Sequence, residues 1–144
     1  LRAGTLRPAR VVGCGAAVKV AMKDREQRQQ GRAALRDQLW ADVQRKIPDV
    51  RLSGALAPRL AHNRNITLPG VSGSRLQRAL KPQLSCSSGS ACSNGAPSHV
   101  LQALGRSRAE AEASLRLSLG RDTTADDIHQ AVIAIGDAVA AVQS

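Results

Sequence analysis

The stretch SLRLSLGRDTT (residues 114–124) carries the clearest structural signal in the chain. Its leucines alternate with polar residues, and strict alternation is typical of a strand with one buried face. Thr123 or Thr124 is then placed to cap a helix that runs to about Val142, because two aspartates would occupy its first turn. The stretch therefore predicts a half-buried strand followed by a helix.

Upstream, a helical pattern extends from about Ala9 to Ile47, and Pro48 ends it. The segment from Lys23 to Arg32 is polar on every side, a pattern typical of a helix that bridges two bodies through solvent. Gly31 is a candidate for a kink or break in this long helix. Apolar residues spaced four apart predict a buried side on its second half, with Trp40 beside it: Leu35, Leu39, Val43 and Ile47.

Shorter elements are expected between these two regions. The pattern indicates strands at 50–53, 65–68 and 83–86, short helices at 72–80 and 97–104, and a loop rich in Ser and Gly at 87–96. One long helix followed by strands interleaved with short helices predicts the α/β class. More closely, we expect an α+β small domain in which a small, mainly antiparallel sheet is packed with helices.

The composition is that of a folded chain. Its 144 residues are 42% apolar and 22% charged, enough for one domain. Aromatic residues make up only 1%, so the core must consist of Leu, Val, Ile and Ala, and we expect a partner surface to complete it. No apolar run approaches the length of a transmembrane helix and no secretory leader pattern stands out, so we expect a cytoplasmic protein with no membrane contact.

The formal net charge of +10 favours an anionic partner, either nucleic acid, a phosphate cofactor or an acidic protein. However, the basic residues are scattered along the sequence, aromatic stacking residues are lacking, and no zinc-finger or RNA-binding signature is present. A solvated, arginine-rich surface is therefore favoured over nucleic-acid binding, and a nucleic-acid-binding domain stays open as an alternative.

Three cysteines, an odd number without metal-ligand spacing, argue against a disulfide framework or a zinc site. Cys92 lies within the Ser/Gly loop, shortly before a predicted helix whose N-terminal amides would favour a thiolate. It is either a reactive thiol or an incidental residue of a connector. Cys14 and Cys86 are expected to be structural, the first as a small packing residue in a helix and the second at the buried end of a strand.

Two further features have both a structural and a chemical interpretation. Arg116 points away from the leucines of its strand, so it is either a solvated side chain or a fixed guanidinium that binds a carboxylate. Gly4 and Thr5 precede a helix, where they form either an ordinary loop or part of a phosphate site. The three histidines have no metal-ligand spacing, and we expect no metal site.

Several motifs together resemble the C-terminal part of cysteine desulfurases, pyridoxal-phosphate (PLP) enzymes of the class V aminotransferase superfamily. The similar segments follow one another in the family's order over nearly the whole chain: LRAGTL (1–6), HNRNITLPGV (62–71), SSGSACS (87–93), PSHVL (97–101), ALG (103–105) and LRLSLGR (115–121) with Thr123-Thr124. The cysteine loop, the helix after it and the end of the strand form a specific combination. The resemblance implies the C-terminal piece of a fold-type-I PLP enzyme.

The resemblance also implies roles for three residues. Cys92 matches the cysteine that receives sulfur from L-cysteine as a persulfide, with L-alanine as the other product. Arg116 matches the arginine that holds the substrate carboxylate, and Thr5 matches a threonine that contacts the PLP phosphate across a homodimer interface. The sulfur then passes to an acceptor, such as an iron–sulfur scaffold protein, which makes the family sulfurtransferases.

The chain also departs from the family pattern. The family's Schiff-base lysine stands next to a histidine, and none of Lys19, Lys23, Lys46 and Lys81 has that context. The usual insert before Pro97 is missing. We therefore expect residues 1–48 to link to a large domain that this chain does not contain and residues 49–144 to form the small domain. A truncated, non-catalytic homologue that carries sulfur or binds a partner is the alternative.

Overall fold

The computed structural model describes Gly4, residues 7–87 and residues 97–143. In chain order the elements are α1 (Pro8–Met22), α2 (Arg25–Lys46), β1 (Arg51–Leu52), β2 (Asn63–Thr67), α3 (Gly73–Leu80), α4 (His99–Ala103), α5 (Arg108–Glu112), β3 (Ser114–Ser118) and α6 (Ala125–Gln143). The strands form one antiparallel sheet in the order β1-β2-β3. The predicted fold class, a small antiparallel sheet packed with helices, is confirmed.

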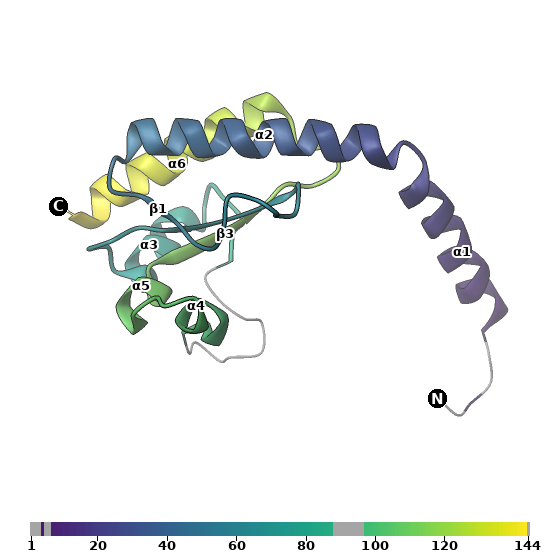
Figure 1. Cartoon of the computed structure of the whole chain (residues 1–144), viewed down its shortest axis with the longest axis horizontal. Helices are drawn as coiled ribbons and strands as arrows, with labels where there is room; N and C mark the ends of the chain where they lie inside the picture. Colours follow the sequence, from purple (N-terminus) through teal and green to yellow (C-terminus); the bar gives the residue numbers. More distant parts are fainter. Residues whose placement is uncertain (1–3, 5–6, 88–96, 144) are drawn as a thin grey trace.

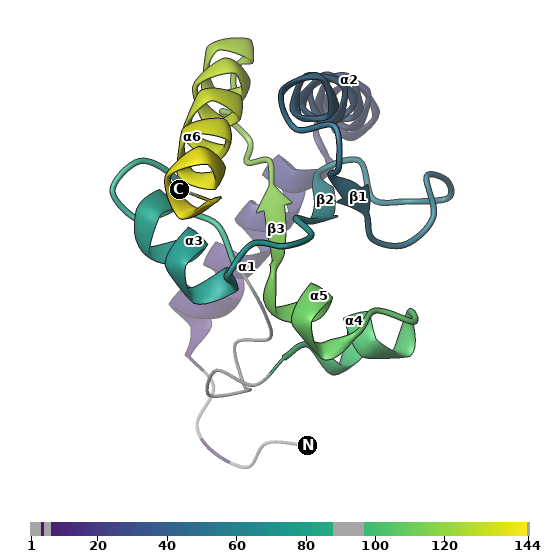
Figure 2. The ribbon, with the colours of Figure 1, turned by 90° about the vertical axis from the view of Figure 1, so that its left-hand side faces the viewer.

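One face of the sheet carries the core. Ile66 of β2 pairs with Leu115 of β3, and Leu117 follows two residues along the same face; all three are buried. Helices α2 and α6 run side by side over the core, as Figures 1 and 2 show. The predicted stripe of α2 is confirmed, because Leu39 and Val43 are buried while the flanking members of the stripe pack partly against the core.

The helix that follows the 114–124 stretch begins as predicted, and Thr124 rather than Thr123 caps it. The Thr124 hydroxyl accepts a hydrogen bond from the Asp127 amide at 3.2 Å, and the Asp127 carboxylate accepts one from the Thr124 amide at 2.8 Å. This reciprocal pair satisfies amides that the first turn of a helix leaves free. Thr123 instead accepts from the Gly120 amide at 2.8 Å, which shapes the turn between β3 and α6.

The single long helix expected from Ala9 to Ile47 is two helices. The chain breaks at Lys23 and Asp24, where Asp24 adopts a left-handed conformation with a φ of 53°. The Arg28 guanidinium donates to the carbonyls of Val20 and Ala21 at 3.0 and 2.6 Å, so it replaces amides that a continuous helix would have supplied. Gly31, the expected kink, lies inside α2 without interrupting it.

Helix α1 projects away from the body of the fold (Figure 1), and none of its residues is buried. Several of its apolar side chains, among them Val11, Val12 and Met22, are more than half exposed. The structure thus leaves an apolar helix uncovered, in line with the expectation that the chain needs a partner surface. Within the described ranges, no helix combines the length and the apolarity that crossing a bilayer requires.

Two further expectations about short elements need correction. Residues 83–86 do not form a strand: a turn at 81–83 follows α3, residues 84–86 have no regular secondary structure, and Ser87 makes an isolated bridge to Arg116. Helix α5 was not expected. The sequence does contain a signal for its start, because Ser107 and Glu110 have the spacing of a capping box. Both hydrogen bonds of the capping box form in the structure.

The core also contains a buried arginine. The Arg64 side chain is 2% exposed and lies over the Trp40 ring at 5.8 Å, and its Nη2 donates to the Asp37 carboxylate at 2.5 Å. Its Nε and Nη1 have no hydrogen-bond partner among the described residues. Burial lowers the pKa of Arg64, and the neighbouring Arg59 and Arg36 guanidiniums act in the same direction. Asp37 is therefore the acceptor on which this buried cation depends.

Two glycines in helices are expected to respond oppositely to alanine. A Cβ on Gly73 would lie 1.9 Å from the Glu112 carbonyl oxygen, so the start of α3 would have to move away from α5. We expect Gly73→Ala to lower the free energy of unfolding by about 2 kcal/mol. Gly31 has open space around its Cα, so Gly31→Ala should raise it by up to about 1 kcal/mol through helix propensity. Urea unfolding measures both, and equal effects would contradict the close approach of α3 to α5.

Candidate functional site

The sheet face opposite the core is polar. Asn63, Asn65 and Thr67 of β2 stand opposite Ser118, Arg116 and Ser114 of β3. At one end a buried chain of hydroxyls joins β2 and β3 to Ser53, the residue after β1: Ser53 contacts Thr67 at 3.0 Å, and Thr67 contacts Ser114 at 2.8 Å. The Ser114 hydroxyl can also donate to the Glu110 carbonyl at 2.7 Å. These bonds fix the register of the strands and hold the polar face rigid.

Arg116 lies in the middle of this face and is exposed, as the alternation of its strand predicted. Its backbone amide donates to the Ser87 carbonyl at 2.6 Å, and its carbonyl accepts from the Ser87 amide at 3.3 Å. Asn65 pairs with it from the other side. The guanidinium has no carboxylate within 4 Å in the described part of the chain, so its full charge is available to a ligand on a strand-supported side chain.

Sequence reasoning missed Asn65 as a site residue. Its side chain shares the polar face with Arg116, because the two are directly opposite in the β2–β3 register. Its Oδ1 atom is buried and has no hydrogen-bond partner among the described residues. A buried, unpaired acceptor is costly unless a donor from a ligand or water completes it. The polar positions of alternating strands were visible in the sequence, but the pairing of Asn65 with Arg116 was not.

Two predicted site residues, Cys92 and Thr5, lie outside the described residues. The structure does describe both flanks of the segment that contains Cys92. On one side Ser87 is bridged to Arg116. On the other, the Ser98 hydroxyl accepts a hydrogen bond from the Leu101 amide and caps α4, at 3.5 Å. The Cys92 segment is therefore anchored next to Arg116 at its start and at a helix N-terminus at its end.

The other two cysteines differ from each other in environment. Cys14 was expected to be a packing residue, and this was wrong: it lies on α1 and is exposed. The reason is that the described part of the chain buries none of the residues of α1. Cys86 is partly buried against the core, and burial raises the pKa of its thiol.

We expect limiting iodoacetamide at neutral pH to alkylate Cys92 first, Cys14 next and Cys86 last. In the sequence Cys92 has small polar neighbours and precedes the helix that begins at His99, and Cys14 is exposed. The raised pKa of Cys86 leaves little thiolate, so its labelling should be at least about tenfold slower than that of Cys92. Peptide mapping by mass spectrometry ranks the sites, and alkylation of Cys14 or Cys86 before Cys92 in the folded chain would contradict this order.

No metal centre is apparent in the described part of the chain. No group of three or more His, Cys, Asp or Glu side chains there is close enough to bind an ion. The lysines also lie away from the polar sheet face. Lys19 and Lys46 belong to α1 and the end of α2, and Lys23 and Lys81 stand at helix C-termini. The groups on or next to the polar face that could bind or react with a ligand are thus the Arg116 guanidinium, the Asn65 amide oxygen and the segment that contains Cys92.

Comparison with known proteins places this geometry in a family. The family model of class-V aminotransferases matches residues 1–131, and the chain belongs to that family. Among curated relatives, it is 42% identical to the cysteine desulfurase IscS of Methylococcus capsulatus, over 97% of this chain and 35% of the relative. It is 43% identical to a cysteine desulfurase of Frankia sp., over 100% and 35% respectively. The chain therefore spans about a third of the length of these relatives.

Solved structures agree on the fold. A NifS-like protein from Rickettsia africae superposes with a TM-score of 0.82 over 95% of this chain and 36% of its own, at 23% sequence identity. A second NifS-like protein gives the same TM-score at 22% identity. At this level of identity the likeness concerns the fold: both contain the arrangement of helices and sheet found here.

Proposed function

We propose that this chain supplies part of the active site of a cysteine desulfurase, with Cys92 as the persulfide-forming cysteine and Arg116 as the group that binds the substrate carboxylate. The observation that carries the proposal is the bridge between Ser87 and Arg116. It fixes the start of the cysteine segment on the strand of the free guanidinium. Only five peptide links separate Ser87 from Cys92, and an extended chain of that length spans at most about 18 Å.

The proposed chemistry divides between the two residues. Arg116 holds the carboxylate of L-cysteine through two parallel hydrogen bonds, which orients the substrate. The Cys92 thiolate takes the substrate sulfur: the C–S bond of L-cysteine breaks, an S–S bond forms on Cys92, and the carbon gains a proton to yield L-alanine. Asn65 is positioned to complete the polar face, since its free Oδ1 would accept from a substrate or side-chain donor.

The residues of this chain do not by themselves fit PLP, the cofactor of the family. Its lysines lie on helices or helix ends, away from the polar face, and none has the Schiff-base context. The proposal therefore requires a further polypeptide segment that carries the cofactor lysine. In that assembly residues 1–48 link to the large domain, residues 49–144 form the small domain, and Thr5 contacts the PLP phosphate within a homodimer.

The sulfur on Cys92 then passes to an acceptor, which we propose is a scaffold protein for iron–sulfur clusters in the cytoplasm. A persulfide that leaves the site needs an accessible carrier thiol. Cys92 meets that need in sequence, because its segment consists of small residues between two anchored ends. The exposed apolar surface of α1 supports the linking role of residues 1–48, since it has no cover within the described chain.

The test is a chimera in which this chain replaces the corresponding third of the Methylococcus relative, whose remaining two thirds we expect to supply the cofactor lysine. Incubation with L-cysteine should yield L-alanine, and alkylation of the trapped persulfide should label Cys92. Cys92→Ser should abolish both signals, while the control Cys14→Ser, at an exposed cysteine of α1, should leave them unchanged. Alanine formation that survives Cys92→Ser in a folded, PLP-loaded chimera would overturn the proposal.

A further inference from the structure

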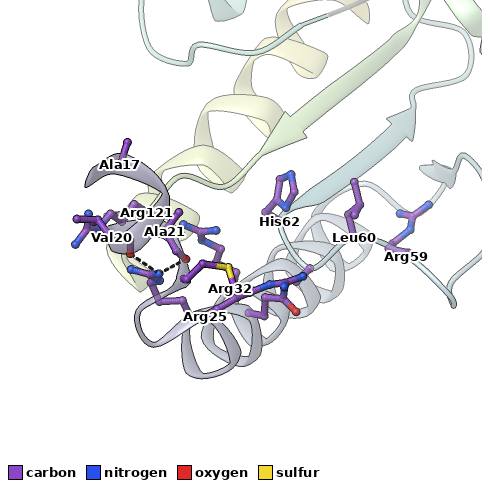
Figure 3. A pocket seen from close by; sticks show the side chains of 13 residues that line it. Ala17, Val20, Ala21, Arg25, Arg32, Arg59, Leu60, His62 and Arg121 are labelled. Atoms are coloured by element: carbon purple, nitrogen blue, oxygen red, sulfur yellow. Dashed lines mark hydrogen bonds between the residues drawn. The ribbon is translucent and has the colours of Figure 1, made fainter. Parts of the chain in front are cut away.

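A cleft of about 790 Å³ lies where α1 meets α2. Its walls are the C-terminal end of α1, the first half of α2, the loop at residues 59–62 and the turn after β3. Figure 3 shows Arg25, Arg32 and Arg121 near Val20 and Ala21, with Arg59, Leu60 and His62 across the cleft. No residue of β2 or β3, the strands of the polar sheet face, lines the cleft.

The charge of the cleft is strongly one-sided. Five arginines line it: Arg25, Arg28, Arg32, Arg59 and Arg121. No Asp or Glu does, although Asp24, Glu26 and Asp122 adjoin these arginines in sequence. In the described part of the chain, every arginine that pairs with a carboxylate lies elsewhere: Arg36, Arg45, Arg51, Arg64, Arg106 and Arg108. The Asp37 carboxylate partly offsets the charge of Arg59, but the five arginines form no ion pair among the described residues. Their charges therefore repel one another unless an anion joins them.

The backbone positions part of this cluster. Arg28 uses Nη2 to bind the carbonyls at the end of α1, and Arg32 uses Nε to bind the Gly120 carbonyl at 3.2 Å. Arg59 binds the Ser53 carbonyl through Nη2 at 2.7 Å, and its Nη1 is buried without a partner among the described residues. Each of these guanidiniums thus keeps unused N–H groups while one of its nitrogens is held. Because these side chains are already held in place, they lose less conformational entropy when an anion binds.

We propose that this cleft binds a ligand with a diphosphate group. Arginine recognises phosphate through paired N–H donors, and two linked phosphates carry about three negative charges at neutral pH, which suits several guanidiniums. The size of the cleft lies within the range of small-molecule sites. Val20, Met22 and Leu60 add an apolar part of the wall that a nucleobase would contact. Both inorganic pyrophosphate and a nucleoside diphosphate contain this group, and the ligand is one or the other.

The experiment is isothermal titration of this chain with pyrophosphate and, separately, with ADP. The cleft variant Arg25→Ala/Arg121→Ala removes two guanidiniums that form no internal hydrogen bond or ion pair in the described chain, so folding should be unaffected. The matched control Arg75→Ala/Arg78→Ala removes the same charge from exposed positions of α3, outside the cleft. Circular dichroism confirms that both variants are folded.

We expect the cleft variant to raise the Kd for pyrophosphate at least about tenfold and the control to raise it less than about twofold. Binding of the unmodified chain should weaken when salt rises from about 50 to about 200 mM. Tighter binding of ADP, lost in Met22→Ala, would identify the nucleoside diphosphate as the source, and equal affinities would identify pyrophosphate. No saturable binding, equal losses in both variants, or preference for a polyglutamate peptide over both phosphates would overturn the proposal.

Discussion

Replacing Asp37 with alanine is expected to lower the free energy of unfolding of this chain by about 3 kcal/mol, the lower end of the range for breaking a buried ion pair. The Arg64 side chain is 2% exposed, and Asp37 is the carboxylate that accepts from it. Without Asp37, the guanidinium stays in the core with no protein acceptor at any nitrogen among the described residues. The Asp37 side chain is 58% exposed, which allows water to enter and keeps the loss at that lower end.

Urea unfolding of the variant and two controls measures the effect. Asp42→Ala breaks a pair with Arg45 on the same helix, and because Arg45 is 79% exposed the loss should stay below about 1 kcal/mol. The double variant Asp37→Ala/Arg64→Leu should recover part of the stability, since an apolar side chain replaces the stranded charge next to Trp40. Recovery should be incomplete, because Arg36 also donates to Asp37 and still lacks that acceptor. A double variant no more stable than Asp37→Ala would show that the stranded charge is not the cause.

Acidification should act through the same pair. The pKa of Asp37 is lowered, first by the hydrogen bonds from Arg36 and further by the charges of Arg36 and Arg64, against an opposing effect of burial. Because the pKa of Asp37 is lowered in the folded state, its carboxylate contributes to the free energy of unfolding. This contribution is fully present above the ordinary aspartate pKa of about 3.9 and is lost as the pH falls toward the lowered pKa. The stability difference between the unmodified chain and Asp37→Ala should therefore shrink below about pH 4.

In the chimera, Arg116→Lys is expected to raise KM for L-cysteine about tenfold to a hundredfold, which corresponds to a loss of about 1.5–3 kcal/mol of binding free energy. A lysine keeps the positive charge but lacks the planar pair of donors that grips a carboxylate. The strand geometry should survive, because the bonds to Ser87 involve only the backbone. Steady-state kinetics with L-cysteine give KM and kcat.

Arg75→Lys on α3 is the matched control, since Arg75 is exposed and lies off the polar face. Its KM should equal that of the unmodified chimera. If Arg116→Lys also leaves KM unchanged while persulfide still forms on Cys92, Arg116 is a solvated surface residue and the carboxylate is held elsewhere. The persulfide role of Cys92 would survive that result, so the two parts of the proposal can fail separately.

Local sequence patterns determined much of the fold. The alternating leucines of residues 114–119 predicted β3, and the capping residues after it predicted α6, because both signals act within a few residues. The buried stripe of α2 was readable for the same reason. The motifs around the cysteine segment also indicated the family by themselves, and the family model confirms it.

Tertiary structure decided the features that depend on distant residues. The break at Asp24 is completed by Arg28, which reaches back to the carbonyls of α1, and no local pattern encodes that contact. The arginines of the cleft are scattered in sequence and meet only because α1, α2 and two loops converge. Asn65, Ser87 and Arg116 become neighbours through strand pairing alone. Side-chain patterns report the environment of one element, whereas contacts between elements follow from how their buried faces pack together.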